Sequence, residues 1–259
     1  LPMVVNPSSG FIINCNGTPY KTSAPGNNPK EEDFDKNFGI ETDMKNRGLR
    51  ALELFNADPS ITEEEFYQYK YDLYYSKDSE IAECIRILLE AAPPKDQLLN
   101  DALAVLRDWD LQTNVENLNA ALPISAFEPI IREDMEKTVE NLHRELQTAA
   151  EALQKHFGAI RVPWGDVNHL ARGDLSLPIN GGPDILHAVY GIAQENGVRH
   201  GVAGDCYILM ATWDEAGKLH SNSIHQFGSA TQLEDSKHYA DQAPLFADRK
   251  LKPVWMDKA

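Results

Sequence analysis

A change in hydrophobic periodicity near residue 158 is the feature that most constrains the fold of this chain. Between residues 41 and 157, apolar residues recur every three or four positions, which is the period of an amphipathic helix. After Gly158, glycine and proline become frequent and the helical period fades. Short apolar runs lie before residue 19 and between residues 206 and 227, as expected of strands. Strands on both sides of a helical middle predict an α+β fold.

The helical middle contains several separate stripes. The expected helices cover residues 41–57, 62–73, 79–92, 96–109 and 133–157. Thr62 and Glu65 have the spacing of a capping box at the start of the second helix. The stretch 110–132 is mixed, because Pro123 and Pro129 interrupt its pattern.

The strand predictions are strongest around Gly217. Residues 206–213 and 218–227 are expected to pair as a β-hairpin across a glycine-containing loop. Cys84 lies on an apolar helix face and Cys206 in the first strand of this hairpin, so both are expected to be buried thiols.

Composition excludes several classes of function. The 40 acidic residues outnumber the 24 basic ones, and the formal net charge is −16. Binding to nucleic acid or to an anionic membrane needs basic surface, so neither partner is expected. The 8 histidines form no zinc-hydrolase motif, and no Gly-x-Ser-x-Gly nucleophile elbow is present.

The segment 6–16, NPSSGFIINCN, carries the candidate chemistry. A turn leads into an apolar run at 11–13, which predicts a strand that ends in Asn14 and Asn16. Side chains two apart on a strand share a face. A fixed carboxamide is a neutral donor of the kind that stabilises an oxyanion during attack on an amide or ester carbonyl. Alternatively, both asparagines cap a turn.

Four motifs resemble those of the penicillin acylase (penicillin amidase) family of N-terminal-nucleophile hydrolases. These are the segment 6–16 with its following Thr18-Pro19, the run WGDVN at 164–168, the run GDLS at 173–176, and HYADQ at 238–242 after FGSA at 227–230. The two central motifs are most similar to the aculeacin and acyl-homoserine-lactone acylase branch. The resemblance extends over nearly the whole chain in the same order.

This resemblance implies the C-terminal portion of an αββα sandwich with a helical lobe. Residues 1–38 would hold sandwich strands and a loop. Residues 39–160 would be the helical lobe, and 161–259 would be return strands and the C-terminal tail. His238 and Asp241 would tie that tail to the sheet by hydrogen bonds.

The candidate catalytic residues carried by the resemblance are Asn16 and Arg47. Asn16 matches the asparagine that donates to the oxyanion, and Arg47 matches an arginine that orients it; Arg50 competes for that role. The chain begins with Leu1 and not with Ser, Thr or Cys, so the nucleophile is expected upstream. Neither Asp33 nor Asp35 matches the family's calcium ligand, and we predict no metal and no cofactor.

The function predicted from these motifs is amide hydrolysis. The chain is interpreted as part of an acylase that cleaves a linear amide, such as the side chain of penicillin or an N-acyl homoserine lactone, through an acyl-enzyme. Its partner would be the upstream portion of the same precursor, namely the α chain and the N-terminal part of the β chain. Without that portion the chain is expected to be inactive. The resemblance implies a periplasmic or extracellular location.

Two alternatives stay open at this point. One is a catalytically silent binding or scaffold protein of the same fold. The other is an unrelated sandwich-plus-helix protein, which requires that segment 11–16 and strands 206–227 do not share a sheet. A glycan on Asn16, within the weak sequon Asn16-Gly17-Thr18, would contradict an active-site asparagine.

Overall fold

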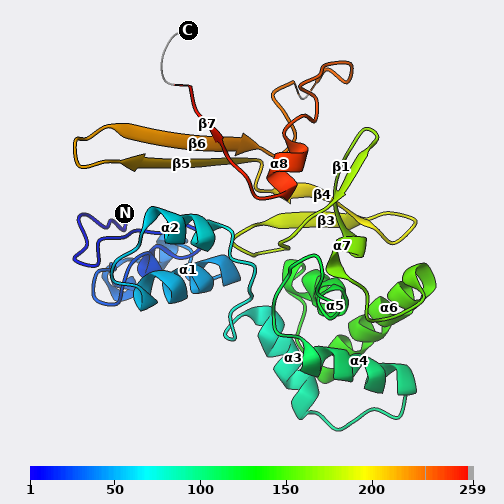
Figure 1. Cartoon of the computed structure of the whole chain (residues 1–259). Helices are drawn as coiled ribbons and strands as arrows, with labels where there is room; N and C mark the ends of the chain where they lie inside the picture. The colour runs from blue at the N-terminus through cyan, green and yellow to red at the C-terminus, as the bar shows by residue number, and fades with distance from the viewer. Residues whose placement is uncertain (231, 256–259) are drawn as a thin grey trace.

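The computed structural model describes residues 1–230 and 232–255 and combines helices with two sheets, which confirms the α+β prediction (Figure 1). The helices are α1 Asn46–Ala57, α2 Glu63–Lys70, α3 Glu80–Glu90, α4 Gln97–Asp108, α5 Ala121–Arg132, α6 Val139–Phe157, α7 Trp164–Val167 and α8 Ala243–Ala247. The strands are β1 Asn168–Arg172, β2 Leu175–Pro178, β3 Val189–Ala193, β4 Arg199–Gly204, β5 Tyr207–Trp213, β6 Leu219–His225 and β7 Lys252–Pro253.

The larger hydrophobic core lies among α3, α4, α5 and α6, which form one helical group in Figure 1. Leu88 of α3, Leu106 of α4, Phe127 of α5 and Leu146 of α6 are at most 2% exposed and belong to one cluster. The apolar stripes of these helices therefore pack against one another, as their period requires. Helices α1 and α2 lie apart from this group, beside the N-terminal segment (Figure 1).

The strands form one mixed and one antiparallel sheet. The four-stranded sheet has the order β2-β1-β4-β3, with β1 parallel to β4 and the other neighbours antiparallel. The three-stranded sheet has the order β5-β6-β7, and the expected hairpin of β5 and β6 is confirmed.

A second hydrophobic cluster joins the two sheets. Leu170 and Val189 of the first sheet meet Ile208 and Ile224 of the second, and Phe246 of α8 completes the cluster. All five side chains are at most 4% exposed. Helix α8 accordingly lies between the two sheets in Figure 1.

The strand expected at residues 11–13 is absent from the structure. The segment has no regular secondary structure, and Ile13 N donates a backbone hydrogen bond to Thr22 O at 2.7 Å. Within the described part of the chain, residues 1–38 contain three short 3₁₀ turns and no strand, which corrects the expectation of sandwich strands there. An apolar run forms a strand only when a neighbouring strand accepts its backbone groups. The division of the chain at residues 38 and 160 stays a prediction.

The helices differ from the sequence pattern at two places. Helix α5 forms within the mixed stretch 110–132, because Pro123 lies in the first turn, where a backbone N–H has no helical acceptor, and Pro129 lies near the end. Helix α6 begins at Val139 and not near 133, because Thr138 caps it by accepting from Asn141 N. The capping box of Thr62 and Glu65 is confirmed.

The two cysteine predictions have different outcomes. Cys84 is fully buried in α3, as expected. Cys206 is exposed, because it precedes β5 by one residue and lies outside the sheet. Strand β5 itself is at the edge of its sheet, and Tyr207, Leu209 and Trp213 are 49%, 52% and 66% exposed on it.

Of the helices in the described residues, none has the length and apolar character of a bilayer-crossing segment.

We expect Leu146→Ala to lower the free energy of unfolding by about 2–5 kcal/mol, since it leaves a cavity among packed helices. Val139→Ala, on the same helix at a side chain that is 39% exposed, should change it much less. Urea unfolding of both variants measures the difference. Equal small losses in the two variants would contradict this account of the core.

Candidate functional site

Asn16 lies in a tight turn, and Asn14 forms that turn. The backbone of Asn16 has φ +57°, and its N–H donates to Asn14 Oδ1 at 3.0 Å. Asparagine tolerates this left-handed conformation better than most residues. The turn-capping alternative thus describes Asn14, whereas the exposed side chain of Asn16 is available for another contact.

Arg47 makes that contact. It is the second residue of α1, and its Nη2 donates to Asn16 Oδ1 at 3.1 Å. Its Nε donates to Asp184 Oδ1, also at 3.1 Å. Because Oδ1 of Asn16 is engaged, the amide Nδ2 is left as the outward donor. Within the residues described, no acceptor binds this Nδ2. The structure therefore brings Asn16 and Arg47 together.

Arg50 is engaged elsewhere. Its Nε and Nη2 bind the two carboxylate oxygens of Asp72 at 3.1 and 2.8 Å, and its Nη1 binds Glu53 at 2.5 Å. This bidentate pair holds the guanidinium away from Asn16. Of the two candidate arginines, only Arg47 contacts Asn16.

Asp184 is the residue at this site that the sequence analysis missed. One carboxylate oxygen binds Arg47, and the other accepts from Asn46 N, the first backbone amide of α1, at 2.5 Å. Lys45, at the cap position, provides no side-chain cap, so Asp184 supplies it from 138 residues away along the chain. Burial raises the pKa of Asp184 above its ordinary value, although the hydrogen bonds from Asn46 and Arg47 act to lower it.

Asn46 fixes the loop of Asp184 a second time. Its Nδ2 donates to the Asp184 carbonyl at 2.7 Å, and its Oδ1 accepts from Ser76 N at 2.7 Å. Asp184 has φ +54°, a left-handed conformation that is uncommon for residues other than glycine. The start of α1 and this loop therefore hold each other in place.

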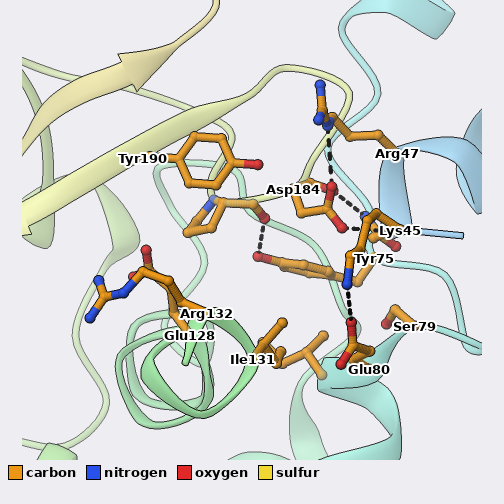
Figure 2. Close-up of a pocket in the computed structure, with 13 residues that line it drawn as sticks. Lys45, Arg47, Tyr75, Ser79, Glu80, Glu128, Ile131, Arg132, Asp184 and Tyr190 are labelled. Atoms are coloured by element: carbon orange, nitrogen blue, oxygen red, sulfur yellow. Dashed lines mark hydrogen bonds and ion pairs between the residues drawn. The ribbon is translucent and has the colours of Figure 1, made fainter. Parts of the chain in front are cut away.

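A cavity of about 310 Å³ lies beside Arg47 and Asp184 (Figure 2). Its lining mixes apolar and charged side chains, among them Tyr75, Ile81, Ile131, Glu80, Glu128 and Tyr190. The hydroxyl of Tyr75 donates to Pro183 O at 2.6 Å and joins the cavity wall to the Asp184 loop. Asn16 is not among the lining residues, but Arg47, which lines the cavity, donates to it.

A half-buried ion pair and a buried histidine anchor the loop after Asp184. Asp205 Oδ2 accepts from Lys70 Nζ at 2.6 Å and lies 3.2 Å from His187 Nδ1. Lys70 Nζ also donates to Leu186 O at 2.6 Å. His187 is fully buried, and burial lowers its pKa although Asp205 opposes this effect.

The other sequence motifs have structural positions. Trp164 Nε1 donates to Gly181 O at 2.7 Å, and Asn168 Nδ2 donates to Ile179 O at 3.0 Å, so the WGDVN run supports the base of the Asp184 loop. At the C-terminal end, His238 Nδ1 lies 2.7 Å from Asp241 Oδ2.

This bond joins His238 and Asp241 to each other, and the tie between the tail and the sheet that was expected from them is made by Gln242 instead. Gln242 Oε1 accepts from His225 N of β6 at 3.1 Å, and Gln242 N donates to Phe227 O at 2.7 Å. Among residues 1–230 and 232–255, no three His, Cys, Asp or Glu side chains are grouped to hold a metal ion.

Comparisons with known proteins support one family. The sequence model described as penicillin amidase matches residues 1–259. The acyl-homoserine lactone acylase PvdQ of Pseudomonas fluorescens strain Pf0-1 is 26% identical over 181 residues, which cover 59% of this chain and 23% of the relative. The same enzyme from strain Pf-5 is 29% identical over 105 residues, or 39% of this chain and 13% of the relative.

A solved structure extends over most of the chain. The thermostable penicillin G acylase from Alcaligenes faecalis aligns with a TM-score of 0.47 and 12% identity, and the alignment covers 97% of this chain and 55% of that one. The chain spans about a quarter or less of the length of the curated relatives it matches.

The buried His187 predicts a pH-dependent stability. An unfolded histidine takes up a proton near pH 6.5, whereas buried His187 resists it, so the unfolded state binds more protons as pH falls. The free energy of unfolding should therefore be highest above about pH 6.5 and decrease as the pH falls below that value. In His187→Gln this decrease should be smaller.

Denaturant unfolding at pH 7.5, 6.5 and 5.5 measures this dependence. His220→Gln, at a largely exposed side chain, serves as the matched control and should keep the wild-type slope. A His187→Gln slope equal to that of wild type would exclude this histidine as the cause.

Proposed function

The chain belongs to the penicillin amidase family, and we propose that its protein hydrolyses linear amides through an acyl-enzyme. The observation that carries the proposal is the hydrogen bond from Arg47 Nη2 to Asn16 Oδ1 at 3.1 Å. This bond orients the carboxamide so that Nδ2 faces away from Arg47. A preorganised donor of this kind stabilises the negative charge that develops on the carbonyl oxygen of an attacked amide.

In this mechanism Asn16 acts on the substrate and Arg47 acts through Asn16. Arg47 keeps the carboxamide in one orientation, since the guanidinium can only donate and therefore binds Oδ1 and not Nδ2. Its positive charge also polarises the amide toward a stronger donor. As the nucleophile attacks, Nδ2 of Asn16 donates to the oxyanion, and it releases the oxygen when the acyl-enzyme forms.

The attacking group is proposed to come from another part of the protein. Cys15 is the thiol nearest to Asn16 in the sequence, but burial raises its pKa, against the opposing charge of Arg47. A nucleophilic cysteine needs a lowered pKa or an adjacent base. In the family, that role belongs to the free N-terminal residue of a processed chain. We propose that the upstream portion of the precursor supplies it after autoprocessing.

The substrate is proposed from the names of the family and the relatives. They point to the side-chain amide of a penicillin or to an N-acyl homoserine lactone, and hence to a part in antibiotic metabolism or in the removal of acyl signals. The mixed apolar and charged cavity beside Arg47 suits part of such a molecule. We place the protein in the periplasm or outside the cell.

The second candidate is a silent binding or scaffold protein of the same fold. The exposed position of Asn16 is compatible with it, because an unused surface asparagine would look the same. The Arg47 contact favours the enzyme, since it holds an exposed side chain in one defined orientation.

We expect Asn16→Ala to lower kcat by about 10²–10³, or about 2.7–4 kcal/mol of transition-state stabilisation. Its folding stability should fall by only about 1–2 kcal/mol, because Ala tolerates the φ of +57° less well than Asn. Asn16→Asp should lose activity too, because it keeps a partner for Arg47 and replaces the donor by an acceptor. Steady-state hydrolysis of a panel of N-acyl 4-nitroanilides, with thermal unfolding in parallel, measures both effects.

The matched control is Asn37→Ala, at an exposed side chain in the same N-terminal region. It should retain wild-type kcat. Wild-type turnover in both Asn16 variants would remove Asn16 from the mechanism, whereas absence of turnover in the wild-type whole protein would favour the silent protein.

We also expect residues 1–259 alone to release no 4-nitroaniline from the same panel. Activity should appear only when the remaining precursor is expressed with them, since the nucleophile resides there. Hydrolysis by the purified chain at the rate of the whole protein would contradict the proposal that the nucleophile lies in the remaining precursor.

A further inference from the structure

We propose that Asp184 is a positioning residue of the reaction: its carboxylate fixes Arg47, and Arg47 in turn holds the Asn16 carboxamide with its donor toward the substrate oxygen. This inference rests on the proposed function. It assigns a role to a loop residue that lies 137 positions from Arg47 and that no sequence motif singled out.

The argument begins with the flexibility of Arg47. An arginine side chain loses much rotamer freedom when it is held in place, and one hydrogen bond to an exposed partner does not compensate for this loss. Asn16 is such a partner. The second bond, from Nε to Asp184 Oδ1, is charge-assisted and fixes the plane of the guanidinium. Without it, Arg47 and therefore Asn16 would sample several orientations.

Asp184 is itself rigid enough to serve as the reference point. Its other oxygen accepts from Asn46 N, its carbonyl accepts from Asn46 Nδ2, and its backbone is held at φ +54°. Displacement of a catalytic group by a small distance is enough to lower a rate strongly. A residue held at both its carboxylate and its carbonyl can fix Arg47, and through Arg47 it can prevent such a displacement of Asn16.

The same helix contains a matched pair that lacks the relay. Arg50, three residues after Arg47, donates to both carboxylate oxygens of Asp72. Neither Arg50 nor Asp72 contacts Asn16. The Arg50–Asp72 pair thus also fixes an arginine of α1 to a carboxylate, but it has no path to the oxyanion. Asp72→Asn is therefore the control for Asp184→Asn.

The relay also depends on the charge of Asp184. The titratable groups that face it come from several elements: Lys45, Arg47, Tyr75, Tyr190 and Cys15. Because burial raises its pKa, this carboxylate takes up a proton at a higher pH than an ordinary aspartate. Protonation removes the charge that holds Arg47, so kcat should decrease on the acid side.

The experiment measures kcat and KM of the whole protein on an N-acyl 4-nitroanilide between pH 4 and 8. Asp184→Asn should lower kcat by about tenfold or more with KM changed less than about threefold, as expected when an interaction made only in the transition state is lost. The decrease of kcat at low pH that is due to protonation of Asp184 should be absent from this variant. Asp72→Asn should keep the wild-type kcat and acid limb, even where it loses stability.

A double-mutant cycle separates positioning from folding. In an Asn16→Ala background, Asp184→Asn should cause little further loss of kcat, because it acts through Asn16. Asp184→Glu, which keeps the charge that caps α1 but moves the carboxylate, should fold if Asp184→Asn does not, and its loss of kcat should vanish in the same background.

Three outcomes overturn the inference. They are wild-type kcat in the Asp184 variants, equal loss in the Asp184→Asn and Asp72→Asn variants, and full additivity with Asn16→Ala. If Asn16→Ala itself has no effect, the proposed function fails instead. If Asn16→Ala lowers kcat and the Asp184 variants do not, only the inference about Asp184 is wrong.

Discussion

The site depends on one carboxylate that begins a helix and holds an arginine at the same time. Asp184 accepts from Asn46 N and from Arg47 Nε, so the loop between β2 and β3 sets both the position of α1 and the orientation of its first charged side chain. Burying a carboxylate is favourable only when donors satisfy it. The pKa of Asp184 is raised, so the effect of burial on this pKa exceeds the opposing effect of the donors. The packing around the loop keeps the carboxylate in place.

The parts of the fold that could be predicted are those decided by local patterns. The capping box at Thr62, the apolar face around Cys84 and the hairpin of β5 and β6 each depend on residues a few positions apart. The failures are of another kind. The run 11–13 has strand composition but no neighbouring strand, and α5 forms despite two prolines because its apolar residues are buried by α3 and α6.

The site was predictable only in part. Asn16 and Arg47 came from a resemblance to known motifs, and their contact across 31 positions agrees with it without testing their roles. Asp184 carries no local signal, since its function as a helix cap and arginine partner exists only after the loop has packed on α1. The one hint is negative: Lys45 precedes the helix and cannot cap it.

The bare edge of β5 has a consequence for anyone who handles this polypeptide. Its outer backbone groups lack a sheet partner in the part of the chain that the structure describes, and Tyr207, Leu209 and Trp213 stand exposed on the strand. Such an edge templates the addition of further strands from other copies. Self-association and low solubility of the polypeptide on its own would then reflect an uncovered strand and not a failure to fold.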